Sequence, residues 1–265
     1  MKEPQKNSGI PLIIIGAVLV GAFIAAYYFY NSSKPKPVTN ANSGTATNAA
    51  KTPVTSASLG ATPPNMLGSP TAAVTVEEFA DFQCGACASV HPTMKELQSL
   101  YGSRIRFIFR NFPLGIPAHD KAYDAAVAAE AAGMQDRNKF WAMQNQLFTN
   151  QQSWTTNPNY REMWADYAQK IGLDVERFKS DMAGKDAKDR VDADLQRGRG
   201  MSINSTPSLF VNGKGIPLES IKIDSLRQMI DAEIQNAIKT QPAGSNTAGV
   251  PAKSADTSNT ASANK

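Results

Sequence analysis

The hydrophobic and polar positions of this chain follow a different pattern in each of four successive regions. Residues 10–30, "IPLIIIGAVLVGAFIAAYYFY", contain no charged residue. As a helix this run is about 30 Å long, enough to cross the hydrocarbon core of a bilayer, and its aromatic end is typical of a membrane interface. A cleaved signal peptide is the alternative, but the run is long and lacks a small-x-small cleavage pattern. We therefore predict a transmembrane anchor at residues 10–30, preceded by a short cytoplasmic N-terminus, residues 1–9.

Two further regions show no hydrophobic period at all. Residues 31–65 and 240–265 are rich in Ser, Thr, Ala, Asn and Pro, a composition that cannot bury enough apolar surface to fold. The first is predicted to be a disordered linker behind the anchor, and the second a disordered tail.

The apolar positions of residues 66–239 recur with the periods of strands and helices. β-branched and aromatic residues predict strands at residues 72–80 and 105–114, with a helix beginning at Cys84 between them. Helical periodicity then dominates residues 117–200. The region ends with a hairpin around "NGKG" and an amphipathic helix for which Asp224 is the predicted N-cap. This order, β-α-β, a helical block, then β-β-α, predicts a single α/β domain with an inserted helical subdomain.

The distribution of charge argues against a nucleic-acid partner. The chain has 27 Lys and Arg against 23 Asp and Glu and a pI of about 9.0. Seven of the bases but only two of the acids lie outside residues 66–239, so the predicted domain is close to neutral. A neutral domain gives no electrostatic reason to bind nucleic acid.

The chain has only two cysteines, Cys84 and Cys87, and their spacing suits three chemistries. A structural disulfide would close a very small loop and stabilise the fold little. A metal site would need more ligands. His91, one helical turn after Cys87, could join both cysteines in a copper carrier, but His119 is the one other histidine.

The position of the pair favours the third chemistry, a redox dithiol. The free backbone N–H groups and the dipole at the start of a helix stabilise an anion. Cys84 is therefore the predicted thiolate nucleophile, and Cys87, one turn into the helix, the resolving thiol. The intervening Gly85 and Ala86 carry no cation, so the thiolate is expected to depend on the helix terminus alone.

The motifs around the cysteines resemble those of the thioredoxin superfamily, and more closely its DsbA-like thiol-disulfide oxidoreductases. The matching features are "VTVEEFADFQCGAC", Pro92 in the following helix, "SINSTPSLFVNG" at residues 202–213, and the helical block between the strands. The resemblance covers roughly residues 66–239. It implies a thioredoxin-like fold with an inserted helical subdomain, preceded here by the predicted transmembrane helix.

The resemblance also implies roles for three further residues. Pro207 matches the cis-proline that faces the dithiol, and Thr206 the residue before it, whose backbone pairs with an extended substrate. Glu78 matches the acidic residue beneath the dithiol, which relays protons to or from Cys87. Glu77 and Asp81 lie nearby in the sequence, so which of the three acids is buried stays open.

The function implied is an enzyme that forms disulfide bonds in exported proteins and needs no cofactor. Its expected partners are reduced exported proteins and a membrane thiol oxidase linked to quinone. An extracytoplasmic reductase or isomerase and the copper carrier are the alternatives. The redox chemistry requires an oxidising compartment, which places the domain outside the cytoplasm on its anchor. We expect a monomer with a redox potential less oxidising than that of relatives with a histidine between the cysteines.

Overall fold

The computed structural model describes residues 27 and 59–240, and these lie in one domain apart from Tyr27. The predicted anchor, apart from Tyr27, the predicted N-terminus and nearly all of the predicted tail lie outside the described residues. Within the described part of the chain, no helix combines the length and the hydropathy needed to cross a bilayer. The predicted linker reaches too far, because Ala61 is already buried and a strand begins at Asn65.

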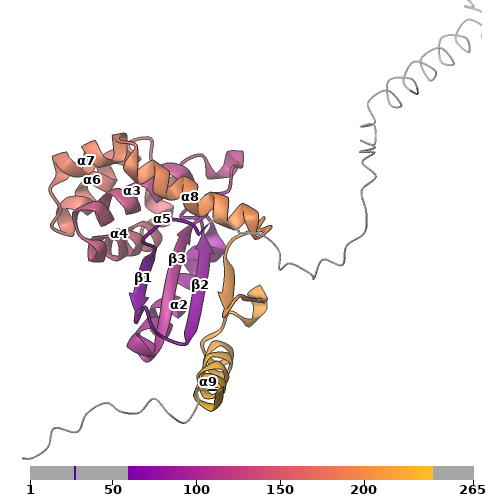
Figure 1. The fold of residues 1–265 in the computed structure, drawn as a ribbon. Coiled ribbons are helices and arrows are strands. Elements are labelled where there is room, and N and C mark those ends of the chain that lie inside the picture. The colour runs from indigo at the N-terminus through magenta and orange to yellow at the C-terminus, as the bar shows by residue number, and fades with distance from the viewer. Residues whose placement is uncertain (1–26, 28–58, 241–265) are drawn as a thin grey trace, which may run out of the picture. The chain divides into compact units, whose positions relative to one another are not determined.

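A five-stranded mixed sheet forms the centre of the domain, in the order β1-β3-β2-β4-β5 (Figure 1). The two central strands are parallel, and every other neighbouring pair is antiparallel. The strands are β1 (Asn65–Gly68), β2 (Val74–Ala80), β3 (Ile105–Asn111), β4 (Ser208–Val211) and β5 (Lys214–Ile216). Both predicted central strands and the hairpin are confirmed, whereas β1 was missed because its four residues show no alternation of apolar and polar positions.

Helices cover the sheet, and six of the described ones form the insertion between β3 and β4. The helices are α2 (Gly85–Tyr101), α3 (Ala122–Gln135), α4 (Arg137–Thr149), α5 (Gln151–Thr155), α6 (Tyr160–Lys170), α7 (Val175–Ala183), α8 (Asp186–Gly200) and α9 (Ile223–Thr240). The predicted cap of the last helix is wrong by a small margin, because α9 starts at Ile223 and Asp224 lies in its first turn. The Tyr101 hydroxyl ties α2 to α9 through Asp231 Oδ1 at 2.8 Å.

An aromatic cluster joins the insertion to the sheet and to the segment that carries the cysteines. Phe82, two residues before Cys84, packs against Phe148 of α4 and Phe109 of β3, with ring centroids 4.7 and 5.7 Å apart. All three rings are buried. Because a buried aromatic ring removes a large apolar area from water, this cluster anchors the end of β2 against both parts of the domain.

A buried charge network lies where α8 crosses the sheet. Arg110 of β3 contacts Glu77 at 2.8 Å and Asp194 at 2.9 Å, and all three side chains are less than a tenth exposed. Asp194 also accepts the N–H of Ala61 at 2.8 Å, and Arg110 donates to the carbonyl of Leu59 at 3.0 Å. The network therefore holds the first described residues of the domain against β3 and α8.

Removing one member of this network should strongly destabilise the fold. We expect Asp194→Ala to lower the free energy of unfolding by about 3 kcal/mol, because it leaves buried cationic and N–H groups without their partner. Urea denaturation measures the loss. The matched control is Asp189→Ala on the same helix, whose partner Lys185 is exposed, and it should cost far less. Equal losses of unfolding free energy in the two variants would contradict the claim that burial makes the Asp194 contacts costly to remove.

Candidate active site

The two cysteines occupy the first turn of α2, where the sheet edge meets the helix. Cys84 is the N-cap, with extended φ and ψ of −72° and 118°, and Cys87 lies one turn inside. Both are free thiols, with Cys84 8% exposed and Cys87 fully buried. Both cysteines are therefore buried, and Cys84 is the one that keeps some exposure.

The environment lowers the pKa of Cys84 to about 5. The largest cause is a hydrogen bond with the side chain of Cys87, and Thr206 and the backbone at Cys87 and Ala86 act in the same direction, against the opposing effect of burial. The expectation that the helix terminus alone holds the thiolate is therefore wrong. Gly85 and Ala86 have no side chain that can stabilise the thiolate, whereas the side chains of Cys87 and Thr206 both lower the pKa of Cys84.

The opposite holds for the second sulfur. Burial raises the pKa of Cys87, and the hydrogen bond and charge of Cys84 raise it further. A thiol that stays protonated can donate to its neighbour, so the same contact lowers one pKa and raises the other. This division makes Cys84 the thiolate at neutral pH and Cys87 the thiol.

The Thr206–Pro207 peptide bond is cis, and the loop that contains it lies against Cys84. The Cys84 thiol donates to the Thr206 carbonyl oxygen at an Sγ–O distance of 3.3 Å. The Thr206 hydroxyl is buried and has no hydrogen-bond partner among the described residues, so it is available to donate to the sulfur once the thiol is ionised. Strand β4, which follows this loop, pairs with β2 and thereby brings Thr206 to the dithiol.

All three neighbouring acids are buried, but each has different partners. Glu77 binds Arg110 and Arg197. Asp81 accepts the N–H of Gln83 at 2.7 Å. Glu78 forms no ion pair with any described residue, and burial raises its pKa to about 8.

Glu78 therefore carries a proton at neutral pH close to Cys87. Its charge is one of the causes that raise the pKa of that thiol, which places the two groups within electrostatic reach. A protonated carboxyl beside a buried sulfur is suited to proton transfer.

His91 does not join the cysteines. Its Nε2 lies 3.2 Å from Asn145 Oδ1, and its ring packs on Phe148 with centroids 4.9 Å apart. No group of three or more His, Cys, Asp or Glu in residues 59–240 is placed to share a metal ion. The copper-carrier alternative, which needed Cys84, Cys87 and His91 together, thus loses its ligand set.

The insertion supplies a contact that the sequence did not indicate. Gln151 of α5 donates from Nε2 to the carbonyl oxygens of Phe82, at 2.7 Å, and of Cys84, at 3.0 Å. A glutamine some 67 positions away in sequence has no local signal that links it to the dithiol. Only the folded structure brings this side chain to the segment that contains Cys84.

Comparison with known proteins identifies the family. A family model described as thioredoxin matches residues 61–232. The chain belongs to the thioredoxin family.

Within this family, the relatives include dedicated thiol proteins and parts of longer ones. The chain is 32% identical over 177 residues to the probable disulfide bond formation protein D of Bacillus cereus, covering 64% of this chain and 78% of that protein. It is 39% identical over 149 residues to the Na(+)/H(+) antiporter NhaA 1 of Mycolicibacterium gilvum, covering 56% of this chain. That match spans only 23% of the antiporter, so the antiporter's name describes a much larger protein.

Solved structures show the same thioredoxin-family fold. BdbD from Bacillus subtilis in its oxidised form superposes with a TM-score of 0.57 at 24% identity, covering 65% of this chain and 93% of BdbD. The thiol-disulfide exchange protein alpha-DsbA2 from Wolbachia pipientis gives a TM-score of 0.54 at 20% identity, covering 64% of this chain and 87% of that one. The predicted α/β fold with a helical insertion is confirmed.

The low pKa of Cys84 should depend on its neighbour. In the reduced thioredoxin-family domain, thiolate absorbance in the ultraviolet should titrate with a midpoint near 5. Cys87→Ala removes the largest stabilising hydrogen bond, so the midpoint should move up by one unit or more, about 1.4 kcal/mol per unit. Ser89→Ala, elsewhere on α2, should leave the midpoint in place. An unshifted midpoint in the Cys87 variant would contradict the assignment.

Burial of Glu78 should make the fold less stable as the pH rises. Its folded pKa of about 8 exceeds the ordinary value of 4.5, so the folded state holds a proton that the unfolded state releases between these values. Stability attributable to this group is therefore present below about pH 4.5 and is lost as the pH rises toward 8. Glu78→Gln should be more stable than the wild type at pH 8 by roughly 2–4 kcal/mol.

At pH 4.5 the difference between these two proteins should nearly vanish, because the folded Glu78 is then protonated and the unfolded one is half protonated, which is worth only about 0.4 kcal/mol. Urea unfolding of the reduced proteins at both pH values measures it. A constant difference across this range would show that Glu78 ionises normally in the folded protein.

Proposed function

We propose that the chain is a thiol-disulfide oxidoreductase that forms disulfide bonds in exported proteins. The observation that carries the proposal is the opposite shift of the two sulfur pKa values, with Cys84 lowered to about 5 and Cys87 raised. One sulfur can thus form and release mixed disulfides, while the other stays protected until it is needed. The relationship to a protein named for disulfide bond formation supports the same activity.

The proposed reaction starts from the oxidised dithiol. A thiolate of the reduced client attacks Cys84 Sγ, the Cys84–Cys87 bond breaks, and Cys87 leaves with the electron pair and takes up a proton. Glu78, protonated at neutral pH, is placed to supply that proton. A second client thiolate then attacks the client sulfur of the mixed disulfide, so that the client leaves oxidised and Cys84 departs as a stable thiolate.

The stability of that thiolate favours the oxidase direction. A low pKa stabilises the reduced form of a dithiol and so makes its disulfide a stronger oxidant. The value of about 5 lies between roughly 7 in thioredoxin and roughly 3.5 in DsbA. The reduction potential is therefore proposed to be intermediate, in line with the absence of a histidine between the cysteines.

The cis-Pro loop is proposed to bind the client beside the reacting sulfur. Thr206 and Pro207 face Cys84, and proline has no N–H that would compete for the substrate. An extended client segment can then pair with the backbone at Thr206. The rest of the proposed setting is an anchor at residues 10–30, an extracytoplasmic domain and, as the family resemblance implies, reoxidation by a quinone-linked membrane partner.

Trapping of mixed disulfides tests the proposal. Cys87→Ala expressed in the native compartment should accumulate covalent complexes between Cys84 and client proteins, which non-reducing gels and mass spectrometry detect. Cys84→Ser in the same background should trap none. The purified wild type should oxidise a reduced, unfolded protein, and both variants should fail to do so catalytically.

Two results would change the assignment. The absence of any trapped species in the Cys87 variant would oppose a redox role altogether. Trapping combined with efficient insulin reduction, but no oxidation of the reduced protein, would favour the reductase or isomerase alternative.

A further inference from the structure

His119 pairs with the buried Asp81, which lies three residues before Cys84. It ends the short 3-10 helix Pro117–His119, and its Nδ1 lies 2.7 Å from Asp81 Oδ2, with the Asp81 side chain fully buried. Asp81 also accepts the N–H groups of Gln83 and Leu114 at 2.7 and 2.8 Å. Because two backbone N–H groups already donate to the Asp81 carboxylate, that group is an acceptor for the His119 Nδ1–H, which leaves Nε2 as the ring nitrogen turned away from Asp81.

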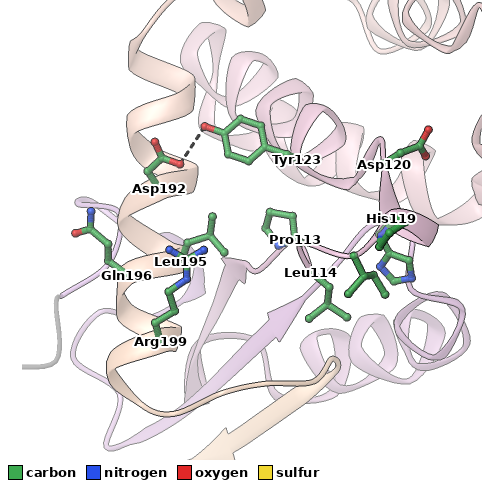
Figure 2. Close-up of a pocket in the computed structure, with 12 residues that line it drawn as sticks. Pro113, Leu114, His119, Asp120, Tyr123, Asp192, Leu195, Gln196 and Arg199 are labelled. Atoms are coloured by element: carbon green, nitrogen blue, oxygen red, sulfur yellow. Dashed lines mark hydrogen bonds between the residues drawn. The ribbon is translucent and has the colours of Figure 1, made fainter. Parts of the chain in front are cut away.

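That nitrogen is open to its surroundings. No described residue forms a hydrogen bond with His119 Nε2, and the atom is not among the buried side-chain atoms that lack a partner. His119 lines a cavity of about 760 Å³ between the loop that follows β3 and helix α8. Figure 2 shows His119 and Leu114 on one side of this cavity and Leu195 and Arg199 on the other.

The loop that carries His119 lies next to the segment that leads to Cys84. Parallel strands β2 and β3 end at the same edge of the sheet, so the loop after β3 lies next to the loop that leads to Cys84. Gln83, the residue before Cys84, accepts the N–H of Lys121 at 2.5 Å and donates to Asp120 at 3.2 Å. The Cys84 N–H itself donates to the Asp81 carbonyl at 3.1 Å. The segment that bears His119 therefore contacts Asp81 and Gln83, which precede Cys84.

The dithiol itself offers no base for an incoming thiol. Gly85 and Ala86 have no ionisable group, and Cys84 and Cys87 are joined as a disulfide when the client arrives. Glu78 already holds its proton at neutral pH. An ordinary cysteine thiol is mostly protonated at that pH, so its attack requires a proton acceptor.

We propose that His119, oriented by Asp81, is this acceptor and acts as general base for the client thiol. The client S–H bond breaks as its proton moves to His119 Nε2, the client sulfur bonds to Cys84 Sγ, and the Cys84–Cys87 bond breaks with its electron pair on Cys87. Asp81 stabilises the imidazolium that results. The inference rests on the proposed function and adds a catalytic residue to it.

Two small thiols with different acidities test the proposal. The oxidised protein is mixed with excess 2-mercaptoethanol or trifluoroethanethiol at one slightly alkaline pH, and loss of the disulfide is followed by acid quench, alkylation and mass spectrometry. The variant is His119→Asn, whose side-chain amide can still donate to Asp81 but has no basic nitrogen. It should react about tenfold or more slowly with 2-mercaptoethanol and nearly normally with the fluorinated thiol, which is largely ionised already.

The chain supplies a matched control and an independent readout. His91→Gln changes the only other histidine and should alter neither rate. Imidazole added to His119→Ala should restore the rate with 2-mercaptoethanol and leave the rate with trifluoroethanethiol unchanged.

Three outcomes would overturn the role of His119. The first is that His119→Asn slows the reactions with both thiols equally, which would mean that the pair only positions the loop. The second is that it slows neither reaction, and the third is that imidazole does not restore the rate. If the proposed function itself is wrong, the result is different, because the wild-type disulfide would then react with neither thiol.

Discussion

The hydrogen bond between the two active-site sulfurs is the interaction on which the rest of the site depends. It is asymmetric because burial keeps Cys87 protonated while Cys84 lies at the helix terminus. One contact therefore lowers the pKa of Cys84 and raises that of Cys87. No charged side chain between the cysteines is needed, which explains how a Gly-Ala pair can support a thiolate at neutral pH.

This contact requires that the first turn of α2 be held in place from several directions. Phe82 packs into the aromatic cluster with Phe148 and Phe109. Gln151 donates to the carbonyl of Cys84 itself, and Asp81 accepts the N–H of Gln83, the residue before Cys84. The helical insertion thus does more than add surface, since it supplies both the ring and the amide that fix the catalytic turn. Buried polar partners of this kind are costly to leave unpaired, so the turn has little freedom to move.

The acids of β2 show how one strand can serve structure and chemistry at once. Neighbouring side chains on a strand point to opposite faces of the sheet, so Glu77 and Glu78 enter different environments. Glu77 meets two arginines and joins the network that holds the domain's first described residues. Glu78 meets no cation among the described residues, and its pKa rises to about 8. Adjacent residues of the same type therefore differ, because Glu77 joins an ion-pair network and Glu78 has a raised pKa.

The proline of the loop beside Cys84 was implied only by the family resemblance. The sequence by itself determined the α/β order of the main elements and the dithiol at the start of a helix. These features depend on local periodicity, turn residues and spacing, which are readable along the chain. Only the tertiary structure decided which acid holds a proton, where β1 begins, and that Gln151, Asp81 and His119 surround the catalytic turn. Those outcomes depend on burial and on contacts between residues far apart in sequence, and neither quantity is encoded in any short segment.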